Sequence, residues 1–75
     1  MSGGYHNRTE LNNVAQRRGH SVQYADTRSG PQHNEIWDSI VYLNQYEYGR
    51  GRSTTKGGAR EVAAGQALIA IAQGY

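Results

Sequence analysis

Glu35-Ile36-Trp37-Asp38-Ser39-Ile40-Val41-Tyr42-Leu43 decides the fold, because residues 35–43 carry the strongest strand pattern in the chain. Alternation places Trp37, Val41 and Leu43 on one face together with Ser39. The opposite face then carries Ile36, Asp38, Ile40 and Tyr42. The larger apolar surface indicates that the Trp37 face packs against a core.

Two further strands flank this segment. Asn44-Gln45 predicts a tight turn, after which residues 46–50 return as a strand. Before it, residues 21–28 alternate, with Val22 and Tyr24 on one face, and are typical of a strand. Ser29 to Asn34 contains Gly-Pro and predicts the loop between the first two strands. Short connections of this kind favour an antiparallel meander.

A helix is expected on each side of the three strands. Residues 8–18 carry an apolar stripe at helical spacing, with Asn7 as the expected N-cap, Glu10 completing a capping box, and Gly19 ending the helix. Residues 59–72 are rich in alanine and predict a second helix, capped by Thr54 or Thr55. The intervening residues 49–58 are expected to form a flexible basic loop.

The predicted fold is therefore α+β, an α-β-β-β-α two-layer sandwich. Its three-stranded antiparallel sheet has two helices packed on one face. With 75 residues, the chain is expected to form one domain over residues 8–72, with a flexible lead-in at residues 1–7 and a short end at residues 73–75.

Composition excludes several classes of function. The chain has no cysteine, and its three histidines lack metal-ligand spacing, so no metal or cofactor is expected. The acidic residues show no catalytic spacing, which predicts that the chain is not an enzyme and takes no small-molecule substrate. No apolar run reaches the about 18 residues that span a bilayer, and the first residues lack a secretory signal. We expect an intracellular protein, cytoplasmic or nuclear, without a membrane partner.

The charge pattern indicates a polyanionic partner. Seven of the eight basic residues are arginine, which binds phosphate in bidentate geometry. Four basic residues and no acid lie within residues 49–60. A local excess of this kind suits nucleic acid better than an acidic small molecule.

Three motifs in order then resemble the double-stranded RNA-binding domain family over about residues 8–72. Thr9-Glu10-Leu11-Asn12-Asn13 is similar to the family's Leu-Asn-Glu element, and Gly30-Pro31-Gln32-His33 to its Gly-Pro-x-His loop. Lys56-Gly57-Gly58-Ala59-Arg60 is similar to Lys-Lys-x-Ala-Lys. Asn13 stands where the family usually has Glu, and Gly57 where it has its second Lys.

The resemblance implies non-catalytic binding of double-stranded RNA by its A-form shape, over two successive minor grooves and the phosphates between them. The first helix and the Gly-Pro-x-His loop would contact 2′-hydroxyls, and the basic start of the second helix would contact phosphates. The implied RNA-binding residues are Thr9, Asn12, Asn13, Gln16, Gly30, Pro31, Gln32, His33, Arg50, Arg52, Thr55, Lys56 and Arg60. Gly57 and the apolar pair Ile40 and Tyr42 favour an alternative, a protein-interaction or homodimerisation module on the same fold.

Overall fold

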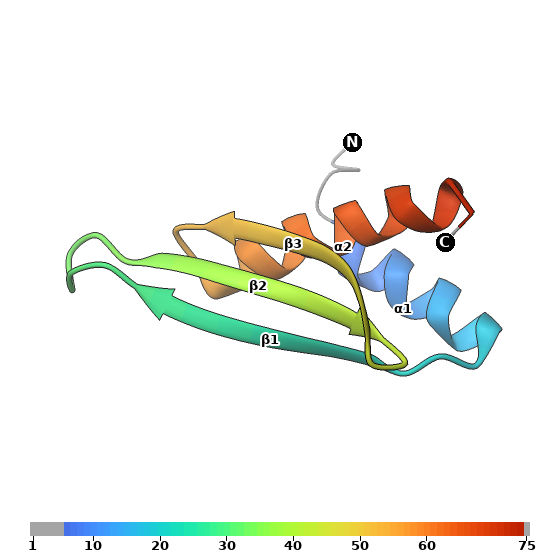
Figure 1. Ribbon diagram of the computed structural model, residues 1–75. Coiled ribbons are helices and arrows are strands. Elements are labelled where there is room, and N and C mark those ends of the chain that lie inside the picture. Colours follow the sequence, from blue (N-terminus) through green and yellow to red (C-terminus); the bar gives the residue numbers. More distant parts are fainter. Residues whose placement is uncertain (1–5, 75) are drawn as a thin grey trace.

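Two helices cover one face of a three-stranded antiparallel sheet, as predicted (Figure 1). The computed structural model describes residues 6–74. Its elements are α1 (Asn7–Arg18), β1 (Val22–Ser29), β2 (Ile36–Leu43), β3 (Tyr46–Ser53) and α2 (Lys56–Ala72). The strand order β1-β2-β3 is the predicted meander.

The β2–β3 turn fixes the pairing next to it, and a register shift between Val41 and Tyr42 sets the pairing of the rest of β3. Asn44 and Gln45 have φ values of 51° and 72°, which is the backbone of a two-residue hairpin turn without the usual glycine. The Asn44 side-chain Oδ1 accepts the backbone N–H of Ser21 at 2.9 Å, and the Asn44 backbone N–H donates to the Ser21 carbonyl at 3.0 Å. These bonds tie the turn to the start of β1.

β3 is longer than the sequence predicted, and the expected flexible loop over residues 49–58 is wrong. The strand continues to Ser53, with Arg50 paired to Ile40 and Gly51 to Ser39. A Cβ atom at Gly51 would collide with the carbonyl oxygen of Ala59 in α2. Glycine at this position therefore allows α2 to lie directly against the strand.

α2 also begins earlier than the predicted residue 59. It starts at Lys56, and the Thr55 hydroxyl accepts the Gly58 N–H at 3.0 Å, which confirms one of the two expected caps. The side of α2 facing the sheet consists of small residues. The buried core residues are Leu11, Ala15, Val41, Leu43, Ala59, Ala63, Ala64 and Ala67. Trp37 lies on the same face of β2 but is only half-buried, at the end of the sheet nearest the start of α2.

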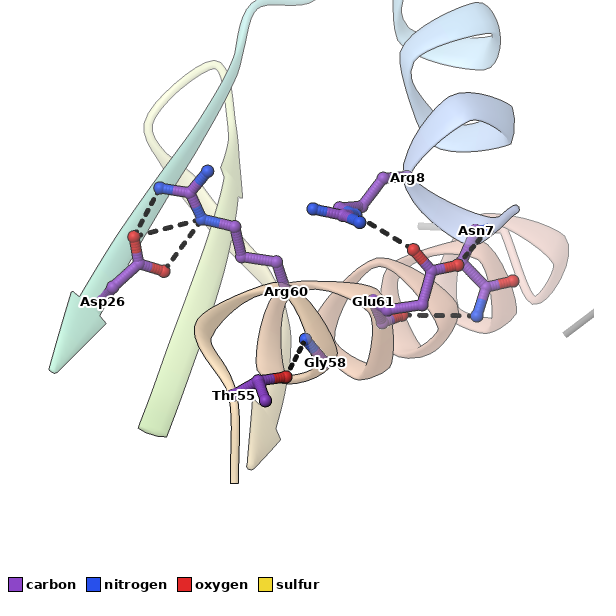
Figure 2. Close-up of polar contacts among 7 residues, drawn as sticks. All are labelled: Asn7, Arg8, Asp26, Thr55, Gly58, Arg60 and Glu61. Carbon is purple, nitrogen blue, oxygen red and sulfur yellow. Dashed lines mark hydrogen bonds and ion pairs between the residues drawn. The ribbon is translucent and has the colours of Figure 1, made fainter. Parts of the chain in front are cut away.

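The capping box predicted for α1 is absent. The helix begins at Asn7, preceded by His6, whose side chain makes no capping bond. Instead, the Glu61 carboxylate of α2 accepts the backbone N–H of Asn7, and the Asn7 amide donates to the Glu61 carbonyl at 3.2 Å (Figure 2). A carboxylate at this position stabilises the positive end of the α1 dipole. Gly19 ends α1 in a left-handed conformation, as predicted.

The ends of the chain lie partly outside the described residues. Residues 1–5 of the predicted lead-in and Tyr75 of the predicted C-terminal end are not described, and Asn7 belongs to α1. Within residues 6–74, every helix is too short or too polar to cross a membrane.

Candidate nucleic-acid interface

The polar side of α1 is exposed over its whole length. Leu11 and Ala15 are buried against the rest of the molecule, and this orientation turns the four predicted polar residues to solvent. The four are Thr9, Asn12, Asn13 and Gln16. Their hydroxyl and amide groups can both donate and accept hydrogen bonds.

The β1–β2 loop is a tight turn held by its backbone. Gly30 has a φ of 87°, and a Cβ atom there would lie 2.6 Å from the Asn34 carbonyl oxygen, so the turn requires glycine. The Asn34 N–H donates to the Pro31 carbonyl at 2.9 Å. Gln32 and His33 are exposed at the tip of this turn. The loop therefore presents polar side chains on a fixed backbone.

The loop and the segment that leads into α2 lie at the same end of the sheet (Figure 1). A shallow depression between them is lined by Gln32, His33, Asn34, Glu35 and Thr54. α1 lies toward the other end, with its first turn against α2 through the Asn7–Glu61 contacts. The start of α2 thus links the two other predicted binding elements.

The first turn of α2 presents an exposed positive charge. It contains no acidic residue, and Lys56 stands at its first position. The Lys56 ammonium lies 5.7 Å from the centroid of the Trp37 ring, which holds it by a cation–π contact. Thr55, also predicted to bind, uses its hydroxyl as the helix cap. A cation at a helix N-terminus opposes the helix dipole, and an external anion would relieve that repulsion.

Arg60, the next predicted phosphate-binding residue, is held by an internal carboxylate. Its Nε donates to both Asp26 carboxylate oxygens at 3.1 Å, and its Nη2 donates to Oδ2 (Figure 2). The buried Ser39 hydroxyl donates to Oδ1 of Asp26 at 2.9 Å. The bonds from Arg60, together with that from Ser39, hold the pKa of the Asp26 carboxyl below its usual range.

The Arg60 guanidinium also stacks over Tyr24, 5.2 Å from the ring centroid. Burial raises the pKa of Tyr24, and its hydroxyl has no hydrogen-bond partner among the described residues. Asp26 was not predicted as a site residue. The signal was present, because Asp26 alternates with Val22 and Tyr24 on the inner face of β1, where a carboxylate requires a cation.

Arg50 and Arg52 lie away from the other predicted site residues. Gly49 and Gly51 face α2, so alternation turns Arg50 and Arg52 to the open face of the sheet. Each forms an ion pair there, Arg50 with Glu47 at 2.6 Å and Arg52 with Asp38 at 2.8 Å. Through these bonds the pKa of the Glu47 carboxyl is lowered, and those of both guanidinium groups are raised.

Arg8 is a further cation near this site that was not predicted from the sequence. Its Nε donates to Oε1 of Glu61 at 2.9 Å, linking α1 to α2 (Figure 2). The side chain remains 45% exposed. No local sequence signal predicts this pairing, because the two residues are 53 positions apart.

The open sheet face also carries Ile40 and Tyr42, which suggested the protein-interaction alternative. Both are half-buried, and that alternative stays a prediction. Among the described positions 6–74, no three histidine or acidic side chains gather closely enough to hold a metal ion.

Comparisons with known proteins identify the same family as the motifs. The pattern of the double-stranded RNA binding motif matches residues 8–71. Ribonuclease 3 of Corynebacterium efficiens is 38% identical over 58 residues, covering 77% of this chain but only 24% of that protein. The chain thus spans about a quarter of that relative.

Solved structures show the same architecture. The first dsRBD of HYL1 is 25% identical, with a TM-score of 0.75 over 87% of this chain and 94% of that one. The solution structure of both dsRBDs of DRB4 with their linker is 28% identical, with a TM-score of 0.73, and the match covers 93% of this chain and 46% of that one.

Proposed function

The chain belongs to the double-stranded RNA binding motif family, and we propose that it binds double-stranded RNA by its A-form shape, without catalysis. A-form RNA displays 2′-hydroxyls in a wide, shallow minor groove, and its deep major groove is closed to side chains. A binding module must therefore contact two minor grooves and the phosphates between them, over about 16 base pairs. The observation that supports this proposal is the arrangement of three exposed elements along a molecule 40 Å long.

The two minor-groove elements are α1 and the β1–β2 loop. Thr9, Asn12, Asn13 and Gln16 supply donors and acceptors for 2′-hydroxyls on one side. Gly30, Pro31, Gln32 and His33 supply them on the other, where the turn fixes their direction. Asn13 can both donate and accept, and it places no negative charge against the RNA. This chemistry distinguishes RNA from DNA, because DNA lacks the 2′-hydroxyl.

The phosphate-binding element is the first turn of α2. Lys56 is its principal cation, since the ammonium is exposed and bonded to no carboxylate within the described residues. Arg60 adds positive charge, but Asp26 already occupies its Nε and Nη2. Arg50 and Arg52 fall outside the proposed surface, because they lie on the open face of the sheet.

The test is a fluorescence-anisotropy titration with three labelled ligands: a ~20-base-pair RNA duplex, the same duplex as DNA, and the RNA single strand. The duplex is longer than the about 16 base pairs that a domain of this family contacts. We expect saturable binding to duplex RNA that weakens with salt, and weaker binding to the other two ligands. Equal affinity for all three ligands would contradict the proposal.

A variant separates the minor-groove contacts from general attraction. Asn13→Ala should lower affinity for duplex RNA more than for duplex DNA. Gln23→Ala, an exposed residue of β1 on the open sheet face, is the matched control and should change neither. Equal losses on RNA and DNA for Asn13→Ala would show that α1 does not contact 2′-hydroxyls.

A further inference from the structure

Arg8 reaches from α1 into the space above the first turn of α2. At Gly57, a Cβ atom would lie 3.8 Å from both Nη1 and Nη2 of Arg8. The guanidinium thus covers the position where a side chain at residue 57 would begin. Because Gly57 has none, the space is open to a cation delivered from the other helix.

The hydrogen bonds of Arg8 leave its terminal nitrogens available. Of the Arg8 nitrogens, only Nε donates to Glu61, at 2.9 Å (Figure 2). Neither Nη atom has a hydrogen-bond partner within residues 6–74. In Arg60, by contrast, Nε and Nη2 both bind Asp26. Arg8 is also the more exposed of the two, with 45% of its side chain accessible against 33% for Arg60.

Glu61 gives Arg8 a defined direction. The Glu61 side chain is only 12% exposed, and the second oxygen of its carboxylate accepts the Asn7 backbone N–H, so the carboxylate is fixed relative to both helices. An arginine held by Nε alone keeps the paired Nη donors that suit a phosphate oxygen pair. The Glu61 contact therefore orients the guanidinium without using the atoms that would bind an anion.

From this geometry we infer that Arg8 is a phosphate-binding residue of the RNA interface, acting beside Lys56 in place of a side chain at position 57. The inference rests on the proposed function and deepens it, since it names a residue of α1 as part of the phosphate site. One helix then contributes to both kinds of contact, with Arg8 on phosphate and Thr9 and Asn13 on the minor groove. Arg8 thus couples the two binding elements.

The experiment compares Arg8→Gln with Arg18→Gln by anisotropy titration against a ~20-base-pair RNA duplex at several salt concentrations. Arg18 offers the same charge change on the same helix, at its opposite end and exposed. We expect Arg8→Gln to weaken binding about fivefold and to reduce the slope of log affinity against log salt by about 0.9, the value for one lost phosphate contact. Arg18→Gln should alter the affinity less than twofold and leave the slope unchanged.

A second variant distinguishes binding from structural support. Gly57→Lys places a new cation at the same point, where the backbone accepts a side chain and only the Arg8 guanidinium is near. Combined with Arg8→Gln, it should restore the lost affinity and the salt slope. In the chain that retains Arg8, Gly57→Lys should raise the affinity by a smaller factor than it does in the Arg8→Gln variant.

Each outcome decides the inference. Restoration by Lys at position 57 supports it. Equal behaviour of Arg8→Gln and Arg18→Gln, in a parent chain that binds duplex RNA, would overturn the inference alone. A loss that position 57 cannot restore, with a lowered melting temperature, would assign Arg8 to helix packing and also overturn it. A parent chain that does not bind duplex RNA would overturn the proposed function together with it.

Discussion

Two neighbouring basic segments meet opposite electrostatic environments. In β3, Arg50 and Arg52 lie on the open sheet face, and each is paired with a carboxylate of the sheet. Only a few residues later, Lys56 stands at the positive end of α2 with no acidic residue in that turn. The same charge is therefore neutralised in one segment and left available in the other. Strand alternation and the position of the helix start decide which basic residues are paired with a carboxylate and which remain available to a ligand.

The largest effect should follow from replacing Gly51, the glycine between Arg50 and Arg52 in β3. Gly51→Ala would drive a Cβ atom into the backbone of α2, so the helix must move away from β3. We expect a loss of about 3 kcal/mol in the free energy of unfolding, at the upper end for overpacked sites, measured by urea denaturation. Gly57→Ala is the control, since open space surrounds that position apart from Arg8. Equal stability of the two variants would contradict this packing.

Replacing one cation of each segment by glutamine tests which segment binds the RNA. Lys56→Gln should weaken binding to duplex RNA about tenfold and reduce the salt slope by about 0.9, as expected for a lost phosphate contact. Arg52→Gln removes the same charge from the open sheet face and should change the affinity less than twofold. A larger loss for Arg52→Gln, measured by anisotropy titration, would place the RNA on the other face of the sheet.

A smaller effect should come from Asp26 of β1, which binds Arg60 in α2. Its pKa in the folded chain lies below that of the unfolded chain, so the stabilisation is complete above about pH 4 and is lost as pH falls through the folded pKa. Asp26→Asn should cost about 1 kcal/mol at neutral pH. Chemical denaturation of both proteins should show this difference closing below about pH 4. A difference that persists unchanged at low pH would mean that the carboxylate charge contributes nothing.

The smallest effect should come from Arg50, whose partner Glu47 lies on the exposed surface. Exposed ion pairs contribute little to stability, because water and salt screen them. Arg50→Gln should therefore leave the urea midpoint unchanged within error. A measurable decrease would show that the charges of β3 are more strongly coupled to the fold than those of an exposed pair.

Local patterns were sufficient for most of the fold. Alternation over residues 35–43, the alanine-rich segment and the Asn44-Gln45 turn predicted the layers and the meander, because each depends on neighbouring residues. β3 was predicted too short, because glycines such as Gly49 and Gly51 are typical of loops. Here they are needed because α2 packs directly against the strand at these positions. The capping box predicted for α1 was wrong for a similar reason: the carboxylate at its first turn comes from Glu61, 54 positions away.

The candidate site shows the same limit. The order of the motifs predicted three elements of the site: the polar face of α1, the Gly-Pro-x-His turn and the start of α2. All three are exposed in the structure. The order of the motifs in the sequence could not predict that Asp26 binds Arg60, or that Glu61 orients Arg8. These pairs join residues that are 34 and 53 positions apart. Which cation is available for a ligand is a property of tertiary contacts.

The position of the RNA on this surface can be mapped by NMR, from the backbone amide chemical shifts recorded while a ~20-base-pair RNA duplex is added. This duplex is longer than the about 16 base pairs that a domain of this family contacts. We expect the perturbed amides to belong to the first turns of α1, the β1–β2 loop and the start of α2. Those of β3 from Gly49 to Arg52 should stay in place. Perturbations concentrated on β3 and the open face of the sheet would contradict this position of the RNA.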